Sequence, residues 1–271
     1  MLPRLQLLEL TDQRWLPAPL RDTVIEALSR ALDWGRMLEP LVEPFRAFVA
    51  ATGSTEVLDV CAGSGGPARV LSRALARHDA RPPRFVMTDL YPRLAAWRRI
   101  RDELPGVVDF VAEPVDATNI PEAIGAGRAR VVINAFHHFP PHLARAIVAD
   151  AVRGSRGIWI SEGFDRNPLR FLLPFAPAGL AALAAGPWLT EERALAKGLL
   201  TYLTPLPLAV SLFDGLVSTL RVYSEAELRD MVAPFGDELE WTYGEAPFAP
   251  FGRAYYFYGV PRTRRACPSS T

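Results

Sequence analysis

The segment from residue 59 to residue 66 carries an acid and then a run of small residues, at the point where an apolar stretch ends. It reads Asp59-Val60-Cys61-Ala62-Gly63-Ser64-Gly65-Gly66. Glycines let the backbone approach a ligand closely, and a turn between a strand and a helix aims N–H groups at that ligand. The Asp59 carboxylate favours a ligand with a cationic end and would repel a phosphate. The segment therefore predicts a binding loop for a ligand that carries a positive charge.

Two other loop chemistries compete for the same glycines. A phosphate-binding P-loop ends in Gly-Lys-Ser/Thr, whereas this loop ends in Gly66-Pro67-Ala68, so that interpretation fails. The dinucleotide pattern G-x-G-x-x-G/A does match Gly63 to Ala68, which leaves an NAD(P)-dependent oxidoreductase as an alternative. A further acid, Asp89, ends the apolar run that starts at Phe85. A carboxylate at that place can bind two ribose hydroxyls, so the ligand is expected to contain a nucleoside.

The elements that must position these acids alternate regularly. Short apolar runs separated by helical stretches predict βαβ units, and therefore a doubly wound α/β fold with a mostly parallel sheet and helices on both faces. Ligands of such sheets bind at the carboxyl ends of the strands. The predicted strands are Glu56–Cys61, Arg84–Thr88, Val107–Val111, Arg130–Asn134 and Gly157–Ser161, and the predicted helices are Pro67–Ala76, Leu94–Leu104 and Leu143–Val152.

With these motifs in order, residues 55–163 resemble the class I S-adenosylmethionine (SAM)-dependent methyltransferases. The acid and glycine turn at 59–66 looks like the family's first motif, with Cys61 where a glycine often stands. Pro114-Val115-Asp116-Ala117 looks like its third motif, in which Asp116 would face the adenine amino group. The resemblance implies SAM as cofactor, S-adenosylhomocysteine (SAH) as product, and a seven-stranded sheet that ends in an antiparallel pair, here Leu239–Tyr243 and Ala254–Gly259 joined by the loop Gly244–Gly252. The implied cofactor-binding residues are Asp59, Ala62, Gly63, Ser64, Gly65, Asp89, Leu90, Asp116, Ala117, Asn134 and Ala135.

Two histidines follow the fourth predicted strand, in Asn134-Ala135-Phe136-His137-His138-Phe139. Either histidine is a candidate catalytic base for an oxygen nucleophile, and packing against the next helix is the alternative role. The segment lacks the Asn/Asp-Pro-Pro-aromatic signature of enzymes that methylate nucleobases or amides, and it resembles the family's small-molecule branch. His142 could join them at a metal, but no acid or cysteine spacing supports one, so no metal is expected.

Residues 168–222 form an apolar insert with two long runs, Phe171–Leu189 and Leu199–Val210. They predict a helical hairpin that covers the cleft as a lid over a lipophilic substrate, and its expected partner is the N-terminal segment with Trp15, Leu16 and Leu20. A dimer interface, a core extension or a membrane contact are the alternatives. Polar groups embedded there are read either as an Asp214–Arg221 ion pair or as substrate contacts, and Glu162 either binds substrate or pairs with Arg166. The expected substrate-binding residues are Trp15, Phe136, Glu162, Asp214, Arg221 and Tyr223.

Composition limits the partners. The 271 residues carry no net charge and no basic block, so nucleic acid is not an expected ligand. Cys61 and Cys267 are expected to be free thiols, and no secretory signal is evident, so a cytoplasmic location is expected, with peripheral membrane contact as an option.

Five parts are predicted: a helical extension (1–54), the SAM-binding core (55–167), the insert or lid (168–222), a helix with a Ser224/Glu227 capping box and the final strands (223–261), and a tail (262–271).

The function predicted from the sequence is transfer of a methyl group from SAM to O, N or C of a lipophilic small molecule. Three alternatives stay open: a cyclase or SAM-binding protein without methyl transfer, the NAD(P)-dependent oxidoreductase, and a membrane-bound binding module.

Overall fold

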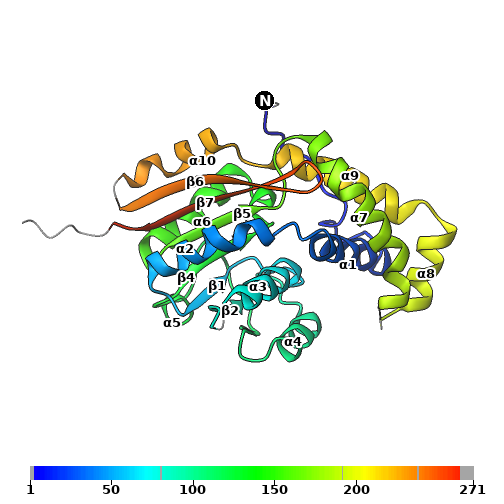
Figure 1. The fold of residues 1–271 in the computed structure, drawn as a ribbon, viewed down its shortest axis with the longest axis horizontal. Helices are drawn as coiled ribbons and strands as arrows, with labels where there is room; N and C mark the ends of the chain where they lie inside the picture. The colour runs from blue at the N-terminus through cyan, green and yellow to red at the C-terminus, as the bar shows by residue number, and fades with distance from the viewer. Residues whose placement is uncertain (1–2, 80, 191, 237, 263–271) are drawn as a thin grey trace, which may run out of the picture.

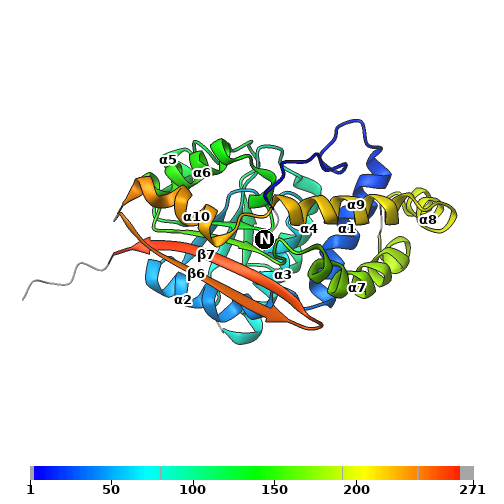
Figure 2. The same cartoon turned by 90° about the horizontal axis from the view of Figure 1, so that it is seen from above.

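The computed structural model describes residues 3–79, 81–190, 192–236 and 238–262, and the predicted tail, with Cys267, lies outside them apart from Arg262. One sheet of seven strands runs through the molecule in the order β3-β2-β1-β4-β5-β7-β6 (Figure 1). The predicted doubly wound, seven-stranded fold is therefore confirmed. α2 (Val42–Thr52) and α3 (Gly66–His78) pack on one face of this sheet, and α6 (Pro141–Gly154) and α10 (Glu225–Val232) pack on the other, as the view from above shows (Figure 2).

Five parallel strands form the sheet's core, and nearly all their residues are buried because helices cover both faces. All five predicted strands are present, shorter by one or two residues at several ends. The bounds are β1 Glu56–Asp59, β2 Arg84–Met87, β3 Val108–Phe110, β4 Ala129–Ile133 and β5 Ile158–Glu162. The connecting helices are α3 Gly66–His78, α4 Leu94–Glu103, α5 Glu122–Gly125 and α6 Pro141–Gly154, and η2 is a short 3-10 turn at Phe136–His138.

The last two strands are antiparallel and longer than predicted. β6 (Leu239–Phe248) pairs with β7 (Gly252–Pro261) over its whole length, and β7 pairs with β5. The predicted loop Gly244–Gly252 was therefore wrong, since the turn is confined to residues 249–251. A Cβ on Gly244 would lie 2.2 Å from the Tyr256 ring, so this glycine makes room for a cross-strand ring inside the strand instead of marking a turn.

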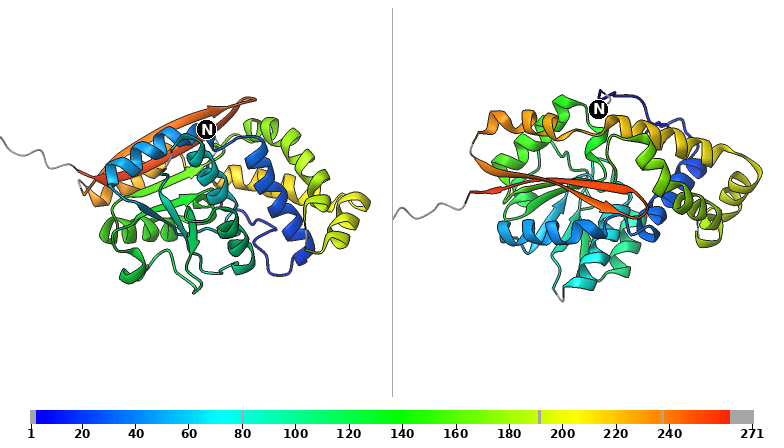
Figure 3. Two further views of the ribbon diagram at one scale, coloured as in Figure 1. Left: turned by 60° about the horizontal axis from the view of Figure 1, so that its bottom comes forward. Right: turned by 45° about the horizontal axis from the view of Figure 1, so that its top comes forward.

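Helix α1 (Ala18–Trp34) and the helices of the insert stack into a separate layer beside the sheet (Figure 3). The insert holds three helices, α7 (Pro168–Leu189), α8 (Ala194–Leu203) and α9 (Leu206–Arg221), so the predicted two-helix hairpin needs correction. Thr204 and Pro205 break the second apolar run, because a proline at the start of a helix cannot continue the preceding one. α1 (Ala18–Trp34) packs against all three.

The remaining described elements precede or follow the parallel strands in the chain. They are η1 (Glu39–Leu41), α2 (Val42–Thr52), α10 (Glu225–Val232) and η3 (Ala233–Phe235). The predicted capping box is confirmed, since the Ser224 side chain accepts from the Glu227 N–H and the Glu227 carboxylate accepts from the Ser224 N–H. Among the described residues no single helix combines the length and apolarity needed to cross a bilayer. α8 and α9 meet both criteria only together, and the break between them bends by 82°.

Candidate active site

A cavity of about 1060 Å³ opens at the carboxyl ends of the parallel strands. The glycine loop forms one end of it, α1 and the insert helices α7 and α9 form the other, and the histidine turn η2 lies between them. Ligand pockets usually measure roughly 300–1,000 Å³, so this cavity has room for more than one small molecule. It is therefore the candidate active site.

The glycine loop is held in shape by its neighbours. Gly63 and Gly65 have φ values of 54° and 84°, which favour glycine. A Cβ on Gly65 would lie 2.6 Å from Ile100 Cδ1, so a larger residue would collide there. The buried Trp97 indole of α4 donates to the Gly63 carbonyl at 2.9 Å. The loop is thus fixed before any ligand arrives.

Asp89 and Asp59 lie at this end of the cavity, and their carboxylates differ in burial and in hydrogen bonding. Asp89 lines the cavity, and its two oxygens accept the N–H groups of Gly63 and Tyr91, each at 2.8 Å. Asp59 is 2% exposed, and among the described residues its carboxylate accepts only one long contact, of 3.5 Å, from the Cys61 N–H. Burial raises the pKa of Asp59 to about 8, because little compensates the loss of water. A ligand cation near Asp59 would supply the missing compensation.

The other predicted cofactor residues divide into two groups. Ala62, Ser64, Asn134 and Ala135 line the cavity together with Gly63 and Asp89. Asn134 takes a positive φ of 53° and its Oδ1 accepts the Gly163 N–H at 2.6 Å. Outside the cavity lining lie Asp59, Gly65, Leu90, Asp116 and Ala117.

Asp116 nevertheless stays close to the loop. Its Oδ1 accepts both the N–H and the hydroxyl of Thr118, so it closes a local turn. Burial, helped by the charges of Asp59, Asp89 and Asp116, raises the pKa of the Cys61 thiol. The Cys61 thiol is therefore neutral and is no candidate nucleophile.

His137 lies deep in the cavity wall between two carboxylates. Its Nδ1 is 2.9 Å from an oxygen of the fully buried Glu162, which also accepts the His137 N–H at 3.0 Å. Its Nε2 is 3.7 Å from Glu9 Oε1. The Glu162 carboxylate is therefore bound to His137. Arg166 donates to the Val222 carbonyl and pairs with Glu227, so the alternative pairing of Glu162 with Arg166 was wrong.

His138 stands beside His137, with ring centroids 4.2 Å apart, and its Nδ1 lies 3.2 Å from Asp12 Oδ2 and 3.6 Å from Glu9 Oε2. Burial lowers its pKa, but the charges of Glu9 and Asp12 and the Asp12 hydrogen bond outweigh burial and raise the pKa of His138 to about 9. At neutral pH a ring in this environment holds a proton, so His138 by itself is poorly suited to accept one.

Asp214 and Arg221 do not pair with each other, so the predicted Asp214–Arg221 ion pair was wrong. Asp214 instead accepts the Leu10 N–H at 2.6 Å and the N–H and hydroxyl of Thr11 at 2.8 and 2.7 Å. Arg221 lies 2.8 Å from Glu9 and donates to the His138 carbonyl at 3.1 Å. Both residues sit on α9 but meet different parts of the N-terminal segment, which lies across the cavity edge.

Of the predicted substrate-binding residues, some line the cavity and others do not. Asp214 lines the cavity, while Phe136, Glu162, Arg221 and Tyr223 lie behind its wall, where the Tyr223 hydroxyl donates to the Phe139 carbonyl. Leu16 and Leu20 do pack in one apolar cluster with Val210 of α9, as predicted, whereas Trp15 is 67% exposed and outside the lining. The apolar lining comes from Val24, Ile25, Leu28, Phe164, Phe171, Leu172, Phe175, Leu180, Leu183, Leu208 and Leu212.

Glu9 and Asp12 are site residues that the sequence did not indicate. They belong to an irregular segment without periodicity, and their partners lie far along the chain at His137, His138 and Arg221. The one usable signal was that Glu9 and Asp12 are the first two acids of the chain and lie close together.

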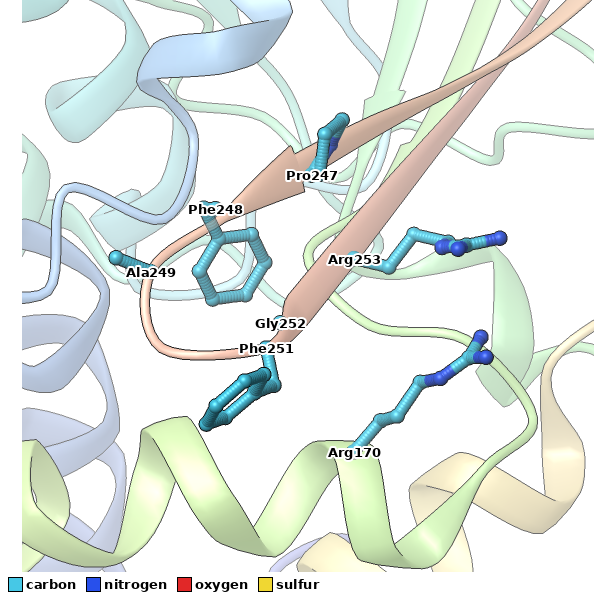
Figure 4. Close-up of a pocket in the computed structure, with 7 residues that line it drawn as sticks. All are labelled: Arg170, Pro247, Phe248, Ala249, Phe251, Gly252 and Arg253. Carbon is cyan, nitrogen blue, oxygen red and sulfur yellow. The ribbon is translucent and has the colours of Figure 1, made fainter.

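A second hollow, of about 540 Å³, lies at the β6–β7 turn (Figure 4). Phe251 lies over α7 there, and Arg170 and Arg253 extend on the same side of the turn. Both arginines already have carboxylate partners, Asp165 and Glu245. The hollow contains none of the glycine-loop or histidine residues, so the larger cavity is the candidate site.

No protein-family model matches the chain, and no curated protein matches it significantly. Solved structures do. The chain is similar to magnesium protoporphyrin IX methyltransferase from Synechocystis PCC 6803 with bound SAH, at 17% identity over 84% of each chain and a TM-score of 0.47. It is similar to an O-methyltransferase from neocarzinostatin biosynthesis in complex with SAH and 1,4-dihydroxy-2-naphthoic acid, at 18% identity over 90% of this chain and 59% of that one, with a TM-score of 0.49.

A third similar structure is the methyltransferase domain of bacterial CtHen1, at 12% identity over 83% of this chain and 99% of that one, with a TM-score of 0.49. These are likenesses at low identity, and they give no residue of this chain a role.

Proposed function

We propose that this protein is a SAM-dependent methyltransferase that acts on a lipophilic small molecule. The observation that carries the proposal is one continuous cavity in which the glycine loop and Asp89 face an apolar chamber. A transferase needs two ligands in contact, and one continuous cavity of this size can hold both. A simple binding protein for one ligand would not need the second chamber.

The glycine-loop end suits SAM in charge and shape. Asp59 is a buried carboxylate without a strong partner, which matches the ammonium of the cofactor's amino-acid end, directly or through water. Asp89 keeps free lone pairs toward the cavity after accepting two backbone N–H groups, so it can accept from ribose hydroxyls. Gly63, Ser64 and Asn134 would border the same ligand. A dinucleotide pyrophosphate beside Asp59 would disfavour ionisation of this acid further and would offer it no opposite charge.

The opposite end suits an apolar acceptor. Phe171 and Phe175 stack at 4.3 Å in its wall, and Leu183 continues that wall along α7. The polar residues on the α9 side, Ser211, Asp214 and Ser218, belong to the helix that also contacts the histidine turn. Such an arrangement holds the body of a lipophilic molecule and orients one polar atom.

SAM supplies a methyl group on a sulfonium, so the protein's contribution is to place the acceptor in line and to exclude water. The apolar helices α1, α7 and α9 exclude water from the chamber. His137 and His138 lie between the two ends, and we propose that they act on the acceptor's heteroatom. Glu162 fixes the orientation of the His137 ring.

We extend the proposal to a peripheral membrane contact through α8 and α9. The only charged residues from 194 to 221 are Lys197, Asp214 and Arg221, and all three are buried. Leu195 and Leu203 are 78% and 74% exposed, so the outer face of these helices is apolar and uncharged. Such a face fits the interfacial region of a bilayer, from which a lipophilic substrate could enter.

Liposome flotation tests the membrane contact. Leu195→Glu with Leu203→Glu should abolish co-flotation, while Leu143→Glu on α6 should leave it unchanged. A stable dimer in light scattering that the double variant dissociates, without any flotation, would favour the homodimer alternative.

Methyl transfer itself is tested with methyl-labelled SAM and a panel of lipophilic alcohols, phenols, amines and acidic carbon compounds, each paired with a polar analogue. We expect label in the organic extract for at least one apolar acceptor and less for its polar partner. SAH binding without any transfer across the panel would favour the cyclase or binding protein. A thermal shift with NAD(P) and none with SAH would favour the oxidoreductase.

A further inference from the structure

Four potential metal ligands from two distant parts of the chain meet in the cavity wall. Glu9 and Asp12 come from the N-terminal segment, and His137 and His138 come from η2. Three contacts join them: Glu9 Oε1 to His137 Nε2 at 3.7 Å, Glu9 Oε2 to His138 Nδ1 at 3.6 Å, and Asp12 Oδ2 to His138 Nδ1 at 3.2 Å. Ligand atoms about 2.0–2.2 Å from one tetrahedral metal lie about 3.3–3.6 Å apart. The spacing is therefore close to that of ligands around a single ion.

The orientation of His137 gives an independent reason to expect a cation. Its Nδ1 faces the buried Glu162 carboxylate at 2.9 Å, so in the neutral ring Nδ1 carries the hydrogen and Nε2 carries a lone pair. His137 is 3% exposed, and within the described residues its Nε2 makes no hydrogen bond. The Nε2 lone pair and Glu9 Oε1 then face each other at 3.7 Å. Arg221 pairs with Glu9 Oε1 at 2.8 Å, but a cation bound to Nε2 would also compensate the histidine lone pair. A carboxylate behind a histidine is also the usual support of a metal-binding imidazole.

The charges around the cluster favour a bound cation. Glu9, Asp12 and Glu162 carry three negative charges. Arg221 pairs with Glu9 and Asp12, and the Arg4 guanidinium donates to the carbonyls of His137 and Phe139. With both histidines neutral, the carboxylates outnumber these two cations. Arg221 and the Ser218 hydroxyl hold Glu9 Oε1 at 2.8 and 2.9 Å, which leaves Glu9 Oε2 directed toward His138. Protonation of both histidines would give the same balance, so the two states must be separated by experiment.

We propose that Glu9, Asp12, His137 and His138 form a binding site for one divalent transition metal. Imidazole nitrogens with carboxylate oxygens suit zinc, manganese or ferrous iron better than calcium. All four residues line the cavity between its two ends. If the proposed function holds, the ion binds and polarises an oxygen of the acceptor, and the histidines act through the metal instead of taking the proton themselves. His142, the third histidine considered from sequence, is exposed and is replaced by Glu9.

The test uses the full chain after treatment with a chelator. Zn²⁺ binding is measured by calorimetry, and Co²⁺ binding by visible absorption, which reports coordination by nitrogen and oxygen ligands. We expect one equivalent per chain and a rise in the unfolding temperature. Glu9→Gln and His138→Gln should each lose stoichiometric binding, and Glu162→Gln should weaken it by about 10–100-fold through loss of His137 positioning. His142→Gln should bind like the unchanged chain.

SAH binding, measured in every variant, shows whether each one is folded and keeps the two proposals separate. Metal binding without SAH binding would remove the proposed function and leave the metal site. The metal site is overturned if the chelated chain takes up no Zn²⁺ or Co²⁺, or if Glu9→Gln and His138→Gln bind as well as His142→Gln. The ion's role in methyl transfer is overturned if transfer is undiminished after chelation while His137→Ala abolishes it, since His137 would then act as a base.

Discussion

The two ends of the cavity are built in different ways. The glycine-loop end consists of residues that directly follow β1, β2 and β4, and their positions are set by the strand order of the sheet. The histidine end depends on Glu9 and Asp12, which reach His138 and Arg221 from the start of the chain. Local sequence can therefore predict the first end, whereas the second exists only after the N-terminal segment has packed against α9.

The largest expected effect is at the histidine end. We expect His137→Ala to lower turnover with an identified acceptor by about 10²–10⁴-fold, the usual contribution of a group that handles the reacting proton or an equivalent interaction. His142→Ala, an exposed histidine on the following helix, is the matched control. Equal turnover in the two variants would mean that placement alone accounts for catalysis.

The contact between the N-terminal segment and α9 can be weakened without changing the histidines. Asp214→Ala removes the acceptor of three hydrogen bonds from Leu10 and Thr11. We expect a loss of about 1.5–3 kcal/mol in the free energy of unfolding, typical of hydrogen bonds to a charged group, and faster proteolysis near residue 10. Asp230→Ala, an exposed acid on α10, should change neither. Unaltered proteolysis in Asp214→Ala would show that other contacts hold the segment.

Asp59 allows a test of the glycine-loop end by pH. Because its pKa is about 8 in the folded chain and 3.8 ordinarily, the unfolded chain releases the proton first as pH rises. The free energy of unfolding should therefore fall between about pH 4 and pH 8 and level off above that. Asp59→Asn should remove this decline, so the ligand-free variant should melt at a higher temperature than the unchanged chain at pH 8. Its SAH affinity should nevertheless be lower. Parallel pH profiles for the two chains would contradict the buried, uncompensated state of Asp59.

The smallest expected effect concerns Trp15. Since its side chain is 67% exposed and outside the cavity lining, Trp15→Ala should change stability by no more than about 0.5 kcal/mol and leave the KM for the acceptor unchanged. A clear rise in KM would return Trp15 to the substrate site.

The strands and the loop were predictable because their signals are local. Apolar runs of five residues flanked by helical patterns identified β1 to β5, and Asp59 and Asp89 followed from their places at strand ends. The loop Gly244–Gly252 was predicted wrongly because, in sequence alone, a glycine that makes room for a ring looks the same as a glycine in a turn. The break of the insert into three helices at Thr204–Pro205 was hidden by continuous apolarity.

The polar contacts of the histidine end could not be predicted, because they depend on tertiary packing. Asp214 and Arg221 are seven residues apart on one helix, which suggested that they would pair. Their positions on α9 instead direct them to different residues of the N-terminal segment, Thr11 and Glu9. Periodicity carries no information on such long-range pairs.

The central claim, that the glycine loop and Asp89 bind the nucleoside of SAM, is tested most directly by calorimetry with SAH. We predict measurable binding to the unchanged chain and a loss of about 1.5–3 kcal/mol in Asp89→Ala, a roughly 10–150-fold weaker Kd. Asp102→Ala, an exposed acid on α4, should bind SAH as the unchanged chain does. No SAH binding by the unchanged chain, or equal affinity in Asp89→Ala and Asp102→Ala, would contradict the claim.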